Sequence, residues 1–180
     1  MLTEVGHKFP DCEVIKGSTL FMEWLGIEPD NYAMLISMSN DHKDKEMEKM
    51  VNWIINERSR TKPHILLDAH FLNFNYGIPT DVTGAWISQM NIYFVITAPS
   101  DEILTRIEND EKISGRERPM FNEIVDRAAK IDKLRSYQKM TVDRAHELGA
   151  MYGKNVYEIL NKNGDLASAA NTFIDNLTRG

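Results

Sequence analysis

Four short runs of apolar residues alternate with segments in which apolar residues recur at helical spacing. The runs cover 12–15, 64–68, 91–97 and 155–160. The second and third are almost continuous in apolar residues, which is typical of strands covered on both faces. Strands that alternate with helices predict crossover connections and a mostly parallel sheet, so the pattern indicates an α/β fold.

The segments between these runs predict four helices. In 44–60 the apolar residues follow one helical face. These residues are Met47, Met50, Val51, Ile54 and Ile55. A second helix is expected from the N-cap Ser100 to about Asp110. A third is expected over 121–148, stopped by Gly149, and the last follows Gly164.

Composition narrows the class of protein. The chain has 180 residues, with 21 Lys and Arg against 27 Asp and Glu, for a net charge of −6. This length fits one domain over 1–180, and the acidic balance argues against broad binding to nucleic acids or membrane surfaces. Cys12 is the one cysteine, which excludes an internal disulfide and favours a reducing, cytoplasmic setting.

The first nine residues do not resemble a targeting segment. They lack a continuous apolar stretch and carry an acidic residue early. No apolar run of the chain reaches the roughly 18 residues that a membrane span needs. The chain instead begins in what looks like the interior of a helix, without a capping residue before it.

Asp68 is the first candidate for chemistry, because it directly follows the apolar stretch Ile65–Leu67. Ligands of open α/β sheets bind beyond the carboxyl ends of the strands. A carboxylate there can hold a metal ion through water or orient an acceptor hydroxyl, or it can simply cap the following turn. His70, two residues on, can contact substrate, although a structural role is the commoner one.

Arginines give the second signal. Arg106 lies on the predicted helix after the third strand, and Arg116 and Arg118 flank a Gly-containing stretch before the long helix. Guanidinium groups suit polyphosphate oxygens through paired, charge-assisted hydrogen bonds. A loop of this kind can serve as a lid in phosphoryl transfer. The alternative is a solvated turn whose arginines pair with nearby carboxylates.

Beyond the last predicted strand lies the polar stretch 161–164, Asn-Lys-Asn-Gly. It can rim a pocket for a base, or it is a simple turn that begins the last helix. The phosphate-binding sequence Gly-x-x-x-x-Gly-Lys-[Ser/Thr] is absent from the chain, as is Gly-x-Gly-x-x-Gly.

Several stretches, in order, resemble the P-loop nucleoside-monophosphate kinases, closest to the archaeal-type adenylate kinases. The stretches are 13–21, 65–70 with the later Gly77-Ile78-Pro79, 94–97 with 102–106, Asp110-Glu111 with 116–118, Asp143-Arg144, and 156–164. The resemblance covers about 12–177. It implies a three-layer fold around a parallel sheet of strand order 2-3-1-4-5, with a helical acceptor-side insertion over 17–62 and an arginine lid over 111–120.

The resemblance also implies roles for particular residues, together with Mg²⁺ and ATP. Asp68 would hold Mg²⁺ through water, or orient the acceptor. The phosphates would be neutralised by Arg106, Arg116, Arg118 and Arg144. The acceptor side would be lined by Gly17, Ser18, His70 and Gly77. The adenine base would be rimmed by Asn161, Asn163 and Gly164.

Two departures from the family pattern stand out. The family's first strand and phosphate loop would precede everything in this chain, and 1–9 would match the rest of the helix after that loop. The chain is then either a truncated form, the explanation we favour, or a degenerate relative. Moreover, 29–40 contains neither arginine nor lysine, so a nucleoside or another hydroxyl acceptor stays open beside AMP.

The sequence therefore supports three functional hypotheses. The leading one is ATP-dependent phosphoryl transfer to a small nucleotide or nucleoside acceptor. The second is a catalytically degenerate kinase-fold module that binds or regulates. The third is an ATPase in which water replaces the acceptor.

Overall fold

The computed structural model describes residues 1–74, 77–114, 119–121 and 123–179. The chain divides into two compact units. Unit 1 comprises Met1–His70 and Val82–Asn91, and unit 2 comprises Phe71–Asp81 and Ile92–Gly180. Each is described by itself.

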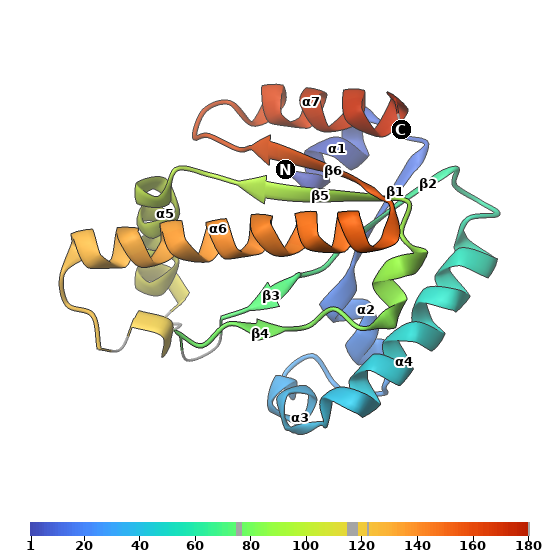
Figure 1. Cartoon of the computed structure of the whole chain (residues 1–180), viewed down its shortest axis with the longest axis horizontal. Helices are drawn as coiled ribbons and strands as arrows, with labels where there is room; N and C mark the ends of the chain where they lie inside the picture. The colour runs from blue at the N-terminus through green and yellow to red at the C-terminus, as the bar shows by residue number, and fades with distance from the viewer. Residues whose placement is uncertain (75–76, 115–118, 122, 180) are drawn as a thin grey trace. The chain divides into compact units, whose positions relative to one another are not determined.

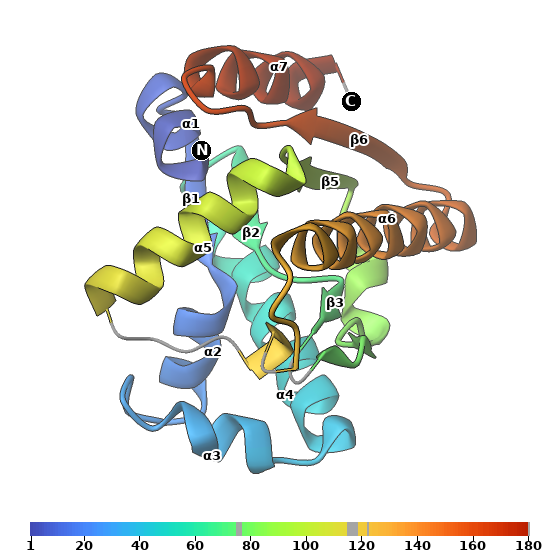
Figure 2. The same cartoon turned by 90° about the vertical axis from the view of Figure 1, so that its left-hand side faces the viewer.

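Unit 1 is built on one pair of parallel strands. Its elements are α1 (Leu2–Lys8), β1 (Cys12–Lys16), α2 (Gly17–Trp24), α3 (Tyr32–Ser37), α4 (Asn40–Trp53), the π-helical turn η1 (Ile54–Arg58), β2 (His64–Asp68) and the 3-10 helix η3 (Ala85–Gln89). Cys12 pairs with His64 at one end of the strand pair and Lys16 pairs with Asp68 at the other. Figure 2 shows β1 running directly into α2.

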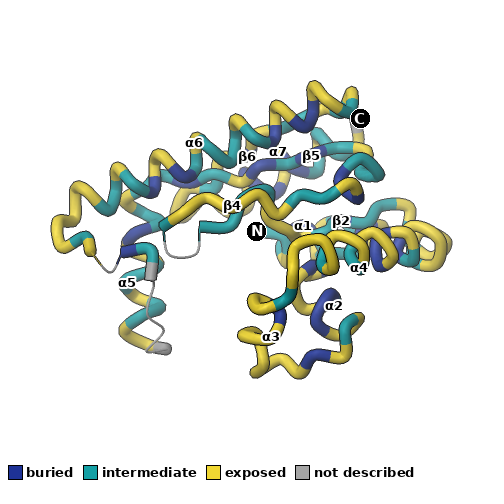
Figure 3. Tube along the Cα trace, turned by 60° about the horizontal axis from the view of Figure 1, so that its bottom comes forward, coloured by how far each residue is buried: buried dark blue, intermediate teal, exposed yellow. Residues whose placement is uncertain are grey.

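The core of unit 1 lies between the strand pair and the helices α2 and α4. Its buried members are Ile15, Phe21, Met22, Ile27, Leu35, Met50 and Ile54. The apolar face predicted for 44–60 is largely confirmed, because Met50, Val51 and Ile54 are buried. Ile55 is exposed, since the π-helical turn that begins at Ile54 changes the helical spacing there. By contrast, most residues of α3 are exposed (Figure 3).

Unit 2 has a second pair of parallel strands. Its elements are β3 (Leu72–Asn73), β4 (Thr80–Asp81), β5 (Ile92–Thr97), α5 (Ser100–Ser114), the 3-10 helix η4 (Pro119–Phe121), α6 (Arg127–Tyr152), β6 (Asn155–Leu160) and α7 (Leu166–Arg179). β5 and β6 are parallel, with Ile92 opposite Asn155. Helix α7 runs along β6 on one side of this pair and α6 lies on the other side (Figure 1).

The two faces of the β5–β6 pair are buried by different residues. On one face Phe94 stacks on Phe173 of α7, with ring centroids 4.0 Å apart. On the other face Gly149 of α6 lies close against Val156 of β6. The short strands β3 and β4 form an antiparallel hairpin, with Leu72 opposite Asp81.

The long helix differs from its prediction at both ends. It begins at Arg127 rather than near Phe121, because Asp126 caps it by accepting a hydrogen bond from the Ala129 amide at 2.8 Å. It continues through Gly149 and ends at Gly153, whose φ of +64° is the left-handed conformation that glycine favours. The predicted stop at Gly149 is therefore wrong.

The four predicted strands, their parallel pairing and the mixed α/β class are confirmed. The helix predicted from Ser100 is also present, and it extends to Ser114. Within the described residues, no helix has both the length and the apolar character that crossing a membrane would require.

Candidate functional site

The carboxyl ends of β1 and β2 bring several predicted residues of unit 1 together. Lys16 and Asp68 are register partners at the last position of the two strands. Gly17 begins α2 immediately after β1. A Cβ atom on Gly17 would lie only 2.7 Å from the carbonyl oxygen of Asp68, so no other residue fits at this position without a shift of the β2 backbone.

The polar side chains at this edge are open to solvent. Ser18, Asp68 and His70 are all exposed. Within the described part of the chain, no hydrogen bond or ion pair engages the Asp68 carboxylate. The alternative role of Asp68 as a cap for the following turn thus has no bond to support it.

In unit 2, the carboxyl ends of β5 and β6 bring together another predicted group. The Asn161 amide donates to the Thr97 carbonyl at 2.8 Å, which extends the ladder by one residue. Arg106 donates to Asn163 Oδ1 through Nε at 3.0 Å and Nη2 at 2.6 Å. Gly164 follows with a φ of +76°, which allows the chain to turn into α7.

Arg144 and Gly77 each have a structural partner, because Arg144 contacts β4 of the β3–β4 hairpin and Gly77 contacts α6. Arg144 pairs with Asp81 of β4 at 2.6 Å and with Glu147 at 3.1 Å. The Gly77 carbonyl accepts a hydrogen bond from the Tyr137 hydroxyl at 2.9 Å. These contacts hold the hairpin against α6.

Arg116 and Arg118 lie outside the described residues, which leave out 115–118 of the predicted lid over 111–120. Its first residues, up to Ser114, form the end of α5. In the part of the chain that the structure describes, no cluster of three or more His, Cys, Asp or Glu side chains could hold a metal ion. Asp68 provides one carboxylate, which suits Mg²⁺ bound chiefly by water and nucleotide phosphates.

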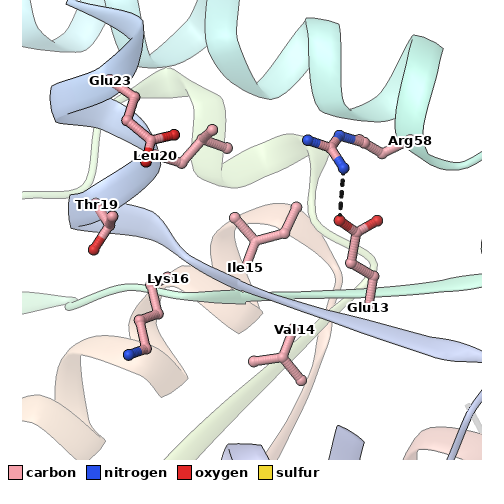
Figure 4. A pocket seen from close by; sticks show the side chains of 8 residues that line it. All are labelled: Glu13, Val14, Ile15, Lys16, Thr19, Leu20, Glu23 and Arg58. Atoms are coloured by element: carbon pink, nitrogen blue, oxygen red, sulfur yellow. Dashed lines mark hydrogen bonds and ion pairs between the residues drawn. The ribbon is translucent and has the colours of Figure 1, made fainter.

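A shallow pocket of about 210 Å³ lies beside β1 and was not predicted from the sequence (Figure 4). It is lined by Glu13, Val14, Ile15, Lys16, Thr19, Leu20, Glu23 and Arg58. Arg58 Nη1 pairs with Glu13 Oε1 at 2.9 Å and its guanidinium lies 5.3 Å from the centre of the Trp53 ring. A charged residue within an apolar strand, here Glu13, is the one sequence signal for this contact.

Cys12 is not placed for nucleophilic chemistry. It lies at the start of β1, the opposite end of the strand pair from Asp68. Burial raises the pKa of its thiol to about 11, with a smaller opposing effect from Lys62. The thiol is therefore protonated and unreactive at neutral pH.

Comparison with known proteins adds no family assignment. No protein-family model matches the chain, and no curated protein matches it either.

Proposed function

We propose that this chain catalyses ATP-dependent phosphoryl transfer to a small nucleotide or nucleoside acceptor on a three-layer, P-loop-kinase-like fold. The observation that carries the proposal is the exposed Asp68 at the carboxyl end of a parallel strand, beside a helix that starts at Gly17. Carboxyl ends of parallel strands are where α/β proteins bind ligands.

The strand pairing supports the fold. In the family order 2-3-1-4-5, the second and third strands are neighbours, as are the fourth and fifth. β1 pairs with β2 and β5 pairs with β6, in the same sequence along the chain. The remaining two pairings of that order both need the first strand, which has no counterpart in the sequence.

The chemistry of the strands agrees with this order. In their interiors β1 carries Glu13 and β6 carries Glu158, whereas the interiors of β2 and β5 are uncharged. Charged side chains protect an edge strand from pairing with other chains. β1 and β6 therefore have the character of sheet edges, and β2 and β5 that of strands paired on both sides.

In this proposal Asp68 orients the acceptor hydroxyl or holds Mg²⁺ through water, and Mg²⁺ supplies charge neutralisation at the phosphates when bound. Gly17 and Ser18 line the acceptor side, where the start of α2 offers backbone amides to an anion. Asn161, Asn163 and Gly164 rim the base. The roles of Arg116 and Arg118 rest on the family resemblance alone.

A second candidate is a kinase-fold module that binds or regulates without catalysis. The observation that favours it is the absence of Gly-x-x-x-x-Gly-Lys-[Ser/Thr] from the sequence. The backbone amides, lysine and hydroxyl of that loop hold the β- and γ-phosphates and Mg²⁺ in P-loop enzymes.

The test is coupled ADP production with ATP, Mg²⁺ and a panel of nucleoside monophosphates and nucleosides, together with calorimetric titration of ATP. Turnover that depends on one acceptor class supports the enzyme, and ATP binding without turnover supports the module. Steady ADP release without any acceptor indicates an ATPase. Absence of both turnover and ATP binding refutes nucleotide chemistry altogether.

Asp68→Asn should lower turnover by at least about 100-fold if its carboxylate orients the acceptor, the range typical of positioned acid–base groups. Asp11→Asn is a matched control, because Asp11 is exposed and directly precedes the opposite end of the same strand pair. Equal activity of the two variants would remove Asp68 from the mechanism.

A further inference from the structure

Two side chains of α5 form hydrogen bonds to the turn between β6 and α7. Glu102 Oε2 accepts a hydrogen bond from the backbone amide of Asn163 at 2.7 Å. Arg106 donates to the side-chain oxygen of the same asparagine through two nitrogens, and Nη2 also approaches the Asn161 carbonyl oxygen at 3.3 Å. Asn163 is thus held at its backbone and its side chain at once.

The local sequence explains why Glu102 and Arg106 can both bind this turn. Glu102 and Arg106 are four residues apart on α5 and so project from one face, with the acidic residue first, which is the favourable order. Arg106 Nη2 also pairs with Glu102 Oε2 at 3.2 Å. Each member therefore fixes the other while both bind the turn.

We infer that Glu102 and Arg106 form a clamp that positions the turn 161–165, and that Arg106 acts on the nucleotide base through this turn rather than on the phosphates. The inference rests on the proposed function, because the turn is the proposed rim of the base pocket. The family resemblance implies instead that Arg106 neutralises phosphates. In the structure, two of its guanidinium nitrogens are committed to Asn163.

The clamp is partly exposed, with side-chain exposures of 42% for Arg106 and 22% for Glu102. Single exposed ion pairs contribute little to stability. Here the pair is one part of a network with charge-assisted hydrogen bonds to backbone and side chain, which are stronger than neutral ones. Its effect should therefore be local to the turn and small on global stability.

Two measurements test the clamp with Arg106→Gln, Arg106→Lys and Glu102→Ala. The first is amide hydrogen exchange at Asn163, which should become roughly tenfold faster in Glu102→Ala, because that amide loses its charged acceptor. Arg106→Lys should restore only part of the protection lost in Arg106→Gln, since an ammonium lacks the planar fork that reaches two groups.

The second measurement compares the affinities for ATP and for inorganic tripolyphosphate, which has no base. Arg106→Gln should weaken ATP binding several-fold and leave tripolyphosphate binding unchanged. Arg135→Gln is the control, because Arg135 is exposed and, among the described residues, pairs with Asp132 one turn away on the same helix α6. This variant should change neither the amide exchange rate of Asn163 nor the affinity for ATP or tripolyphosphate.

The outcomes separate the clamp from the proposed function. Unchanged exchange at Asn163 in Glu102→Ala and Arg106→Gln would overturn the clamp. Equal weakening of ATP and tripolyphosphate would overturn the base-positioning role and make Arg106 a phosphate ligand. If the unmodified protein binds neither compound, the proposed function fails and the positioning role with it, while the exchange data still decide whether the clamp exists.

Discussion

Gly149 offers the sharpest test of packing in unit 2, because it lies inside α6 where a glycine is otherwise unfavourable. A Cβ atom there would lie 2.5 Å from Val156 Cγ2 and 3.0 Å from the Lys154 carbonyl oxygen. Neither is the far end of a flexible side chain. Gly149→Ala therefore forces α6 and β6 apart.

Two opposing terms set the size of the effect. Replacing glycine by alanine inside a helix gains about 1 kcal/mol, while overpacking a well-packed site costs typically about 1–3 kcal/mol. Because one of the two clashing groups is backbone, we expect the upper part of that cost. The free energy of unfolding should fall by about 1–2 kcal/mol. In a protein of this size, each kcal/mol lowers the melting temperature by roughly 2–4 °C.

Urea denaturation followed by circular dichroism measures the change, with Gly6→Ala as the matched control. Gly6 is also helical, but a Cβ atom there would lie 3.4 Å from Val14 Cγ2, an ordinary contact. That variant should be neutral or more stable by up to about 1 kcal/mol.

The combination with Val156→Ala identifies the clash. Shortening Val156 removes the nearer obstacle, so the double variant should lose less stability than the two single variants summed. A Gly149→Ala protein as stable as the unmodified one, or strictly additive losses, would refute the close packing of α6 on β6.

Three further predictions concern single sites. Phe173→Ala should destabilise unit 2 by about 3–5 kcal/mol in urea denaturation, because Phe173 is only 2% exposed and stacks on Phe94. A loss of stability below about 1 kcal/mol would contradict this packing. Gly17→Ala should displace the backbone at Asp68, seen as amide shift changes at 67–69 in NMR spectra, whereas unchanged shifts would contradict the 2.7 Å approach. The pKa of the Cys12 thiol is about 11 in the folded protein and about 8.5 in an unfolded chain, so its contribution to the free energy of unfolding is intact below pH 8.5 and is lost as pH rises from there toward 11. Cys12→Ala should therefore lose less stability than the unmodified protein as pH is raised through this range in urea denaturation. Equal losses in the two proteins would contradict the raised pKa.

The sequence predicted the strands well, because each strand is a short apolar run and strands of buried parallel sheets have this pattern. It also predicted the helix start at Ser100 and the final helix after Gly164. Periodicity and turn residues are local signals, and these elements depend on little else.

Contacts between residues that are not adjacent in the sequence explain the features that the sequence did not predict. Gly149 looks like a helix stop, but it is a site of close approach to Val156, and nothing in the neighbouring sequence distinguishes the two uses of glycine. Arg106 and Asn163 are 57 residues apart, so their bond could not be anticipated from spacing. The structure gives several of the predicted candidates partners that the sequence does not reveal.

The candidate residues therefore fall into two groups with different value for functional tests. Gly17, Gly77, Arg106 and Arg144 each have close structural contacts, so substituting them alters local structure as well as any ligand contact. The exposed Asp68 carboxylate has no such bond within the described residues, and Asp68→Asn keeps its shape. A loss of activity in that variant without a loss of stability can come only from the chemistry of the carboxylate, which makes Asp68 the residue on which the proposed function should be judged.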